Sequence, residues 1–173
     1  MKLRPLRIAA GLTTLAATIL ASPITASAGT LDFGVGGAPA ISSFTPITLT
    51  GVPQLTSLTV APFSIVDATA SLAGWHVTLT VPDLVNGGST ILASTMSMDA
   101  PTVTPSGGAD PTNVVGHAAA GNFAAGEKIV TAAAGFGDGT YLISPQPVEL
   151  TVPVTAKTGT YTSAATIGVV SGP

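Results

Sequence analysis

The chain has 173 residues, of which 46% are hydrophobic, 8% charged and 5% aromatic, and it contains no cysteine. The missing cysteine excludes disulfide scaffolds, cysteine-based zinc sites and thiol chemistry. So apolar a composition argues against disorder, and the few Glu, Lys and Arg residues argue against long helices and coiled coils. We therefore expect an all-β domain rich in Thr, Val, Ala and Gly.

Residues 1–28 have the three parts of a secretory signal peptide. Three basic residues stand within the first seven positions, residues 8–20 are apolar, and an A-x-A pattern ends at Ala28. The apolar run is shorter than the roughly 20 residues of a membrane span, and no second run follows. We predict cleavage after Ala28 and a secreted chain of residues 29–173, located at the cell surface or in the cell wall without an integral membrane span. A buried N-terminal helix is the alternative interpretation.

Removal of this leader would leave an acidic chain. Three of the five Lys and Arg residues lie in it, whereas all eight Asp and Glu residues follow it, so the expected mature charge is −6. Two lysines, Lys128 and Lys157, cannot neutralise the several phosphates that a nucleic-acid binder contacts. Nucleic acid and anionic lipid are therefore excluded as partners, and a partner must be held by hydrogen bonds, stacking or a bridging cation.

Alternation of apolar and polar residues predicts strands along the mature chain. The clearest run is 75–81, which places Trp75 and Val77 on its inward face with Leu79 and Val81. The predicted strands, in chain order, are 47–49, 58–60, 63–66, 75–81, 90–98, 128–133, 148–154 and 161–169. Gly-containing turn signals separate several of them, and no stretch has sustained helical periodicity. This pattern predicts an antiparallel β-sandwich, either Ig-like or a jelly-roll-like Greek key.

The sequence gives no reason to divide the mature chain. We predict one domain over residues 45–173, preceded by residues 29–44 as an arm or a first strand. The stretch 101–111, with three prolines and two glycines, is expected to be a loop. The Ala- and Gly-rich stretch 112–126 is expected to be irregular, with at most one short helical turn.

No catalytic constellation stands out. A triad needs a base, and only His76 and His117 could supply it; no G-x-S-x-G or H-E-x-x-H pattern occurs. Asp67 is expected to cap a strand end, and Asp138 and other acids beside Pro or Gly are expected in turns. We therefore predict no enzyme activity, no cofactor and no metal. A hydrolase with dispersed acids and a calcium site at Asp138 are the alternatives.

Two groups of residues resemble a known family. The first is Phe63-Ser64-Ile65-Val66-Asp67 followed by Gly74-Trp75-His76-Val77. The second combines Val148-Glu149-Leu150-Thr151-Val152-Pro153 with Lys157-Thr158-Gly159-Thr160-Tyr161-Thr162-Ser163. In their order and terminal position they are similar to the WxL domain of Gram-positive surface proteins, in its actinobacterial form, over roughly residues 45–173. Valine replaces leucine in the first Trp-x-Leu motif, and Ile167-Gly168-Val169 stands where the second is expected.

The resemblance implies a β-sandwich displayed outside the cell and bound non-covalently to peptidoglycan or another wall glycan. It marks Trp75, Val77 and Tyr161 as motif residues. Trp75 would either pack in the core, as its inward position favours, or stack on a sugar ring. A second interpretation is a self-assembling extracellular matrix or fibre subunit, because few lysines protect the strand edges. Its partners would then be other surface proteins or further copies of the chain.

Overall fold

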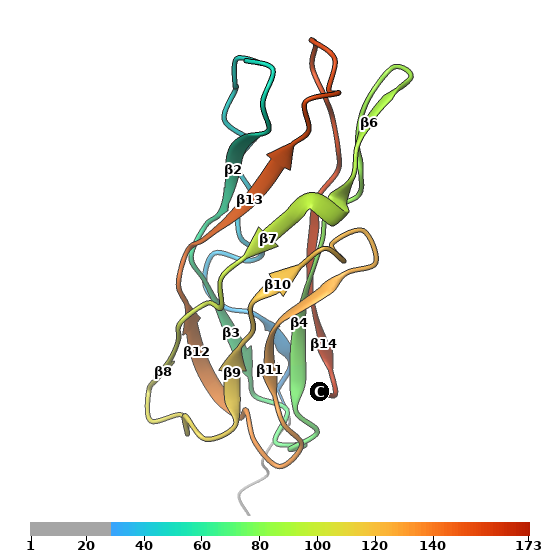
Figure 1. Ribbon diagram of the computed structural model, residues 1–173. Coiled ribbons are helices and arrows are strands. Elements are labelled where there is room, and N and C mark those ends of the chain that lie inside the picture. The colour runs from blue at the N-terminus through green and yellow to red at the C-terminus, as the bar shows by residue number, and fades with distance from the viewer. Residues whose placement is uncertain (1–28) are drawn as a thin grey trace, which may run out of the picture.

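The computed structural model describes residues 29–173, which form fourteen strands and one 3₁₀ turn (Figure 1). The predicted signal peptide and its cleavage site at Ala28 lie outside the described residues. The elements are β1 Leu31–Phe33, β2 Gln54–Val60, β3 Phe63–Asp67, β4 Trp75–Thr80, β5 Leu84–Asn86, β6 Ser89–Ile91, η1 Ala93–Thr95, β7 Met96–Met98, β8 Val103–Ser106, β9 Val114–Gly116, β10 Ala119–Ala120, β11 Glu127–Ala132, β12 Gly139–Ile143, β13 Gln146–Val152 and β14 Thr166–Ser171.

Two short sheets form the first layer of a sandwich, one continuing the other. Their strand orders are β1-β3-β12-β8 and β10-β7-β13-β2. Strand β2 leads directly into β3, β12 into β13, and β7 into β8. Each of these junctions contains a proline, Pro62, Pro145 and Pro101 respectively, which has no amide hydrogen to donate to a sheet. The prolines thus interrupt three neighbouring strands between the two sheets.

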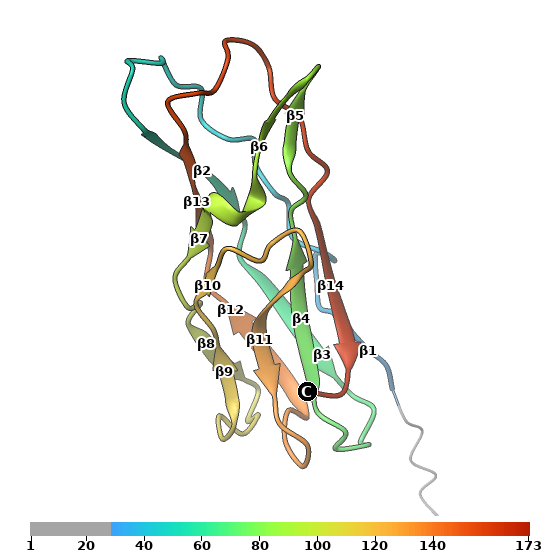
Figure 2. The same ribbon diagram turned by 45° about the vertical axis from the view of Figure 1, so that its right-hand side comes forward.

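The second layer is an antiparallel sheet with the order β14-β4-β11-β9. The β5–β6 hairpin projects beyond β4, and a single bridge between Val85 and Thr162 ties it to the chain before β14 (Figures 1 and 2). Every strand pair in the molecule's described part is antiparallel. The predicted all-β sandwich is confirmed.

The core lies between the layers and follows the alternation of the longer strands. Trp75, Val77 and Leu79 of β4 are fully buried, as the sequence predicts. In β13 every second residue from Gln146 to Val152 is buried. Val154, expected to face inward, is instead 54% exposed because the strand ends at Val152 and the chain turns. Alternation therefore predicts orientation only while a strand continues.

Three predicted strands differ from the structure. Residues 47–49 belong to no strand. The run 90–98 is split into β6, η1 and β7, where the amide of Ala93 donates to the Asp83 carboxylate at 2.7 Å. The run 161–169 is regular only from Thr166 onward.

Several strands lie where the sequence predicts loops. Strand β8 falls within 101–111, β9 and β10 fall within 112–126, and β12 was not predicted. Strand β8 contains Pro105 and lies at the edge of its sheet, where proline is tolerated. Segment 29–44 contains β1, which pairs with β3, so it begins with a first strand rather than a detached arm.

Candidate functional site

Trp75 and Val77 lie in the core. The indole Nε1–H of Trp75 donates to the carbonyl of Gly137 at 2.9 Å, and its ring packs on Tyr141 with centroids 5.6 Å apart. A Cβ on Gly137 would lie 2.6 Å from the indole nitrogen, so glycine allows this close approach. Because both predicted motif residues are fully buried, neither side chain is accessible to a partner at the surface.

Tyr161 is the one predicted site residue that lines a surface hollow. It is half-buried, packs against the core, and accepts a hydrogen bond from the Lys157 amide on its hydroxyl at 3.1 Å. The structure does not bring it together with Trp75 and Val77, which face the interior of the sandwich. Of the three, only Tyr161 is placed to touch a partner.

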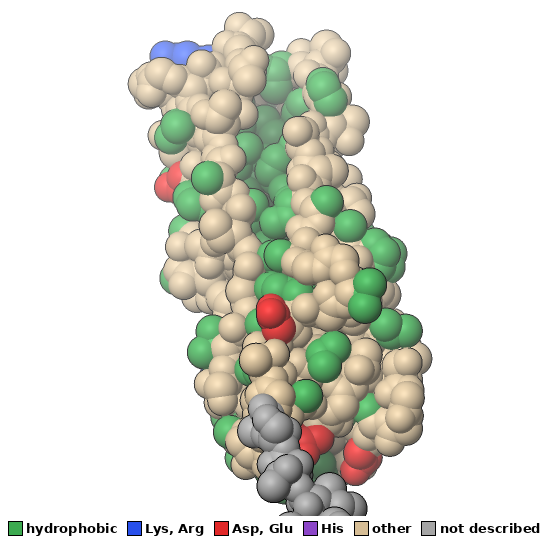
Figure 3. Space-filling model, turned by 180° about the vertical axis from the view of Figure 1, so that it is seen from behind, with side chains coloured by type: hydrophobic (Ala, Val, Ile, Leu, Met, Phe, Trp, Pro, Cys, Tyr) green, Lys and Arg blue, Asp and Glu red, His purple; other side chains and the backbone are tan. Residues whose placement is uncertain are grey.

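The hollow is an open groove of about 920 Å³ between the two layers. Strand β1 pairs with β3 and contacts β14, so it closes the slot between the layers near one end of the molecule (Figure 2). Beyond β1 the slot is lined by residues 41–49 on one side and 156–165 on the other. Seen from behind, it is a trough with hydrophobic side chains in its depth (Figure 3).

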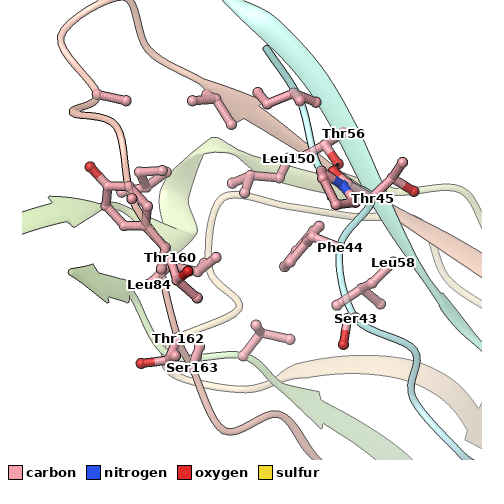
Figure 4. Close-up of a pocket in the computed structure, with 18 of the residues that line it drawn as sticks. Ser43, Phe44, Thr45, Thr56, Leu58, Leu84, Leu150, Thr160, Thr162 and Ser163 are labelled. Carbon is pink, nitrogen blue, oxygen red and sulfur yellow. Dashed lines mark hydrogen bonds between the residues drawn. The ribbon is translucent and has the colours of Figure 1, made fainter. Parts of the chain in front are cut away.

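Aliphatic side chains from both layers form the floor of the groove. They are core residues of the sandwich, namely Leu58, Val81, Leu84, Ile91, Leu150 and Val152. Phe44 lines the groove on the same side as Leu58, and Thr160 lies across from them, on the side of Leu84 (Figure 4). The exposed hydroxyls of Thr48, Thr160 and other Ser and Thr residues lie above this floor. The groove therefore combines an apolar floor with hydroxyl-bearing rims.

Both rims contain backbone amides without a backbone partner. On one side Thr45 donates to Ser57, but within the described residues the amides of 47–49 make no backbone hydrogen bond. On the other side Thr162 exchanges two bonds with Val85, whereas the amides of 163–165 likewise make none. Backbone amides without a backbone partner are available to pair with an added strand.

The groove carries almost no charge. Lys157 is the sole charged residue among the groove-lining positions of the described chain. Because the eight carboxylates lie elsewhere, the groove is neutral to weakly positive on an otherwise acidic molecule. Its chemistry suits an uncharged, partly apolar partner.

The two histidines are separately engaged outside the groove. His76 Nδ1 donates to the Gly172 carbonyl at 2.6 Å, and His117 Nε2 bonds the Thr131 hydroxyl at 2.7 Å. Neither histidine bonds a carboxylate in the described structure, so neither has the orienting acid of a catalytic triad.

Asp67 and Asp110 are held by neighbouring threonines, whereas Asp138 is not. Asp67 accepts the amide and hydroxyl of Thr69, which confirms the predicted cap, and Asp110 accepts the Thr112 amide. Hydrogen bonds from Thr112 lower the pKa of Asp110. One oxygen of Asp138 is buried without a hydrogen bond, yet no group of three or more His, Asp or Glu in residues 29–173 could hold a metal ion.

Tyr141 is a buried residue that sequence reasoning missed. Its hydroxyl donates to the carbonyls of Asp110 at 2.7 Å and Asp138 at 3.2 Å. Burial is the main cause that raises the pKa of Tyr141, and the nearby carboxylates of Asp110, Asp138 and Asp67 add to it. The phenol is therefore a neutral, structural hydrogen-bond donor beside Trp75.

The groove was not predicted either. One signal was present in the sequence: Ile47 and Leu49 alternate with polar residues, as in a strand, but the structure gives this segment no neighbouring strand beyond Thr45.

In residues 29–173 no helix is long and apolar enough to cross a membrane. No family model, curated protein or solved structure matches the chain.

Proposed function

We propose that this chain is a secreted, non-catalytic surface module that acts by binding an extended, uncharged partner in the groove. The observation that carries the proposal is the groove itself: an apolar floor, hydroxyl-bearing rims and no carboxylate among its lining residues. An open trough with unpaired backbone on both rims suits a long, narrow partner better than a compact small molecule.

Cell-wall association is the location that the WxL resemblance implies, and we propose it for this chain. A glycan strand of peptidoglycan is extended and carries many neutral hydroxyls. Phe44 and Tyr161 offer ring surface within the groove, and exposed hydroxyls such as those of Thr48 and Thr160 could bond its sugars. Because Trp75 is buried, Tyr161 takes the place that Trp75 had as the candidate sugar-stacking residue.

Co-sedimentation with purified peptidoglycan sacculi tests this function. The chain from residue 29 onward should pellet saturably, and high salt should not release it, because the groove contacts are neutral. Thr48→Asp puts a carboxylate on the groove rim, whereas Thr104→Asp puts the same group on exposed β8, away from the groove. We expect pelleting to be lost in the first variant and retained in the second. Absent pelleting, or equal pelleting of both variants, would contradict wall binding through the groove.

A self-assembling structural subunit is the second candidate function. The unpaired amides of residues 47–49 and 163–165 favour it, because they match the backbone of a strand from another protein chain. Concentration-dependent oligomers in the absence of any glycan would distinguish this function from wall binding.

A further inference from the structure

The slot between the two layers is already closed in part by the chain's own N-terminal strand. Strand β1 pairs with β3 through three residue pairs and contacts β14, and Leu31 and Phe33 pack against the core. Its alternate apolar side chains point inward while the backbone completes a sheet edge. The groove is the continuation of this slot, where none of the described segments does the same. What fits the slot is therefore visible in the molecule: an extended segment with apolar residues at every second position.

We propose that the groove receives the N-terminal segment 29–35 of a second copy of this chain. The inference rests on the proposed role of the groove as the binding site and names its occupant. The segment would lie as an added strand against the rims at 47–49 and 163–165, with its apolar side chains on the aliphatic floor.

Segment 29–35 has the sequence pattern that such a strand needs. Leu31, Phe33 and Val35 alternate with polar residues or glycine, and seven extended residues span about 23 Å. Val35 is fully exposed at a turn in which the Gly37 amide donates to Gly34 at 2.9 Å. An apolar side chain without contacts gains most from transfer into an apolar groove. Cleavage after Ala28, as the sequence predicts, would make this segment the free amino end of the chain.

The distribution of charge favours the same pair of surfaces. Two copies of expected charge −6 repel each other over most of their surfaces. The groove presents Lys157 and no carboxylate, and segment 29–35 carries one acid, Asp32. These two surfaces bring no pair of carboxylates together, and the side-chain charges that they carry, on Lys157 and Asp32, are of opposite sign.

Moving segment 29–35 from its own sheet into the groove of a second copy costs the donor some of its own contacts, and this cost makes assembly depend on concentration. The donor loses its β1–β3 pairing and the edge-to-face contact of Phe33 with Phe63, whose ring centroids lie 5.8 Å apart. New backbone bonds and apolar contacts in the acceptor groove replace them. Assembly should therefore depend on concentration, and because segment and groove are different surfaces it should give open-ended oligomers.

Sedimentation velocity over a wide concentration range, without any added glycan, tests the proposal. The chain from residue 29 onward contains the whole described fold and should form oligomers of increasing size. Val35→Asp damages only the donor segment and Thr48→Asp only the groove; both residues are exposed, so the monomer should fold normally. Each variant should require about a tenfold or higher concentration to associate, since a carboxylate would enter an apolar site, while Thr104→Asp should behave as the parent chain.

Mixing the two defective variants gives the sharpest result. Val35→Asp retains an intact groove and Thr48→Asp an intact segment, so together they should form a one-to-one heterodimer that grows no further. Association of Val35→Asp equal to that of the parent, or a parent that stays monomeric throughout, would overturn the proposal. Sacculus binding that Thr48→Asp abolishes, in a parent chain that stays monomeric at every concentration, would overturn this proposal and leave the groove as the glycan-binding site. A parent chain that neither associates nor binds sacculi would contradict the proposed function as well.

Discussion

Replacement of Trp75 by phenylalanine tests the core around this residue. The change keeps an aromatic ring but removes the indole N–H that donates to the Gly137 carbonyl at 2.9 Å. That carbonyl would remain buried without a partner, at a cost of about 1–3 kcal/mol. The smaller ring also leaves space beside Tyr141, for about 1 kcal/mol more. We expect the free energy of unfolding to fall by about 2–4 kcal/mol, a large part of the 5–15 kcal/mol typical of a domain.

Urea unfolding followed by far-ultraviolet circular dichroism measures this loss, since the variant lacks the chain's one tryptophan. The melting temperature should fall by about 5–15 °C. Tyr161→Phe is the matched control: it also removes one polar atom from an aromatic residue, but its hydroxyl bonds only the exposed Lys157 backbone. The control should stay within about 0.5 kcal/mol of the parent. Equal stability of Trp75→Phe and the control would refute the assignment of this indole to a hydrogen-bonded core.

Three further predictions concern the same region. Gly137→Ala and Gly135→Ala both place alanine at positive φ, but only at 137 would the new Cβ meet the indole. The free energy of unfolding should therefore fall by roughly 1 kcal/mol or more further in Gly137→Ala than in Gly135→Ala, with a lower urea midpoint. Equal midpoints would contradict the close approach. Burial raises the pKa of Tyr141, so the unfolded chain loses this proton first and stability should decline as pH rises above about 10. Tyr141→Phe should show a shallower decline between pH 8 and 11, and identical slopes would argue against a buried neutral phenol. Asp67→Ala removes the acceptor of the Thr69 amide and hydroxyl and should cost about 1–3 kcal/mol in thermal or urea unfolding, whereas a neutral result would show that this cap is dispensable.

The parts of the fold that the sequence predicts are those in which local pattern and tertiary burial agree. Strand β4 alternates over its whole length and faces the core on one side, so its inward residues, Trp75 included, follow from period-two spacing alone. The same holds for β13 up to Val152. The prediction for Val154 is wrong because spacing does not show where a strand ends.

The strands that were missed depend on partners distant in the chain. Strand β12 contains Thr140, Tyr141 and Ile143, which favour strands, so a local signal was present and was overlooked. Its place between β3 and β8, however, depends on residues far away in the chain. Strand β8 contains a proline, so its sequence predicts a loop unless its position at the edge of the sheet is known. The groove was harder to predict, because it results from the lack of a neighbouring strand beside residues 47–49, which no local pattern reveals.

The central claim is that the groove is where this chain binds its partner, and hydrogen–deuterium exchange read by mass spectrometry tests it most directly. In the dilute chain the amides of residues 47–49 and 163–165 should exchange rapidly, because they have no backbone partner. On addition of sacculi, or at concentrations at which the chain associates, exchange should slow at these two segments together. The amides of Gly107 and Gly108, which also make no backbone hydrogen bond within residues 29–173 but lie outside the groove, should stay unchanged. Slowed exchange at Gly107 and Gly108, with both rims still exchanging rapidly, would contradict the claim.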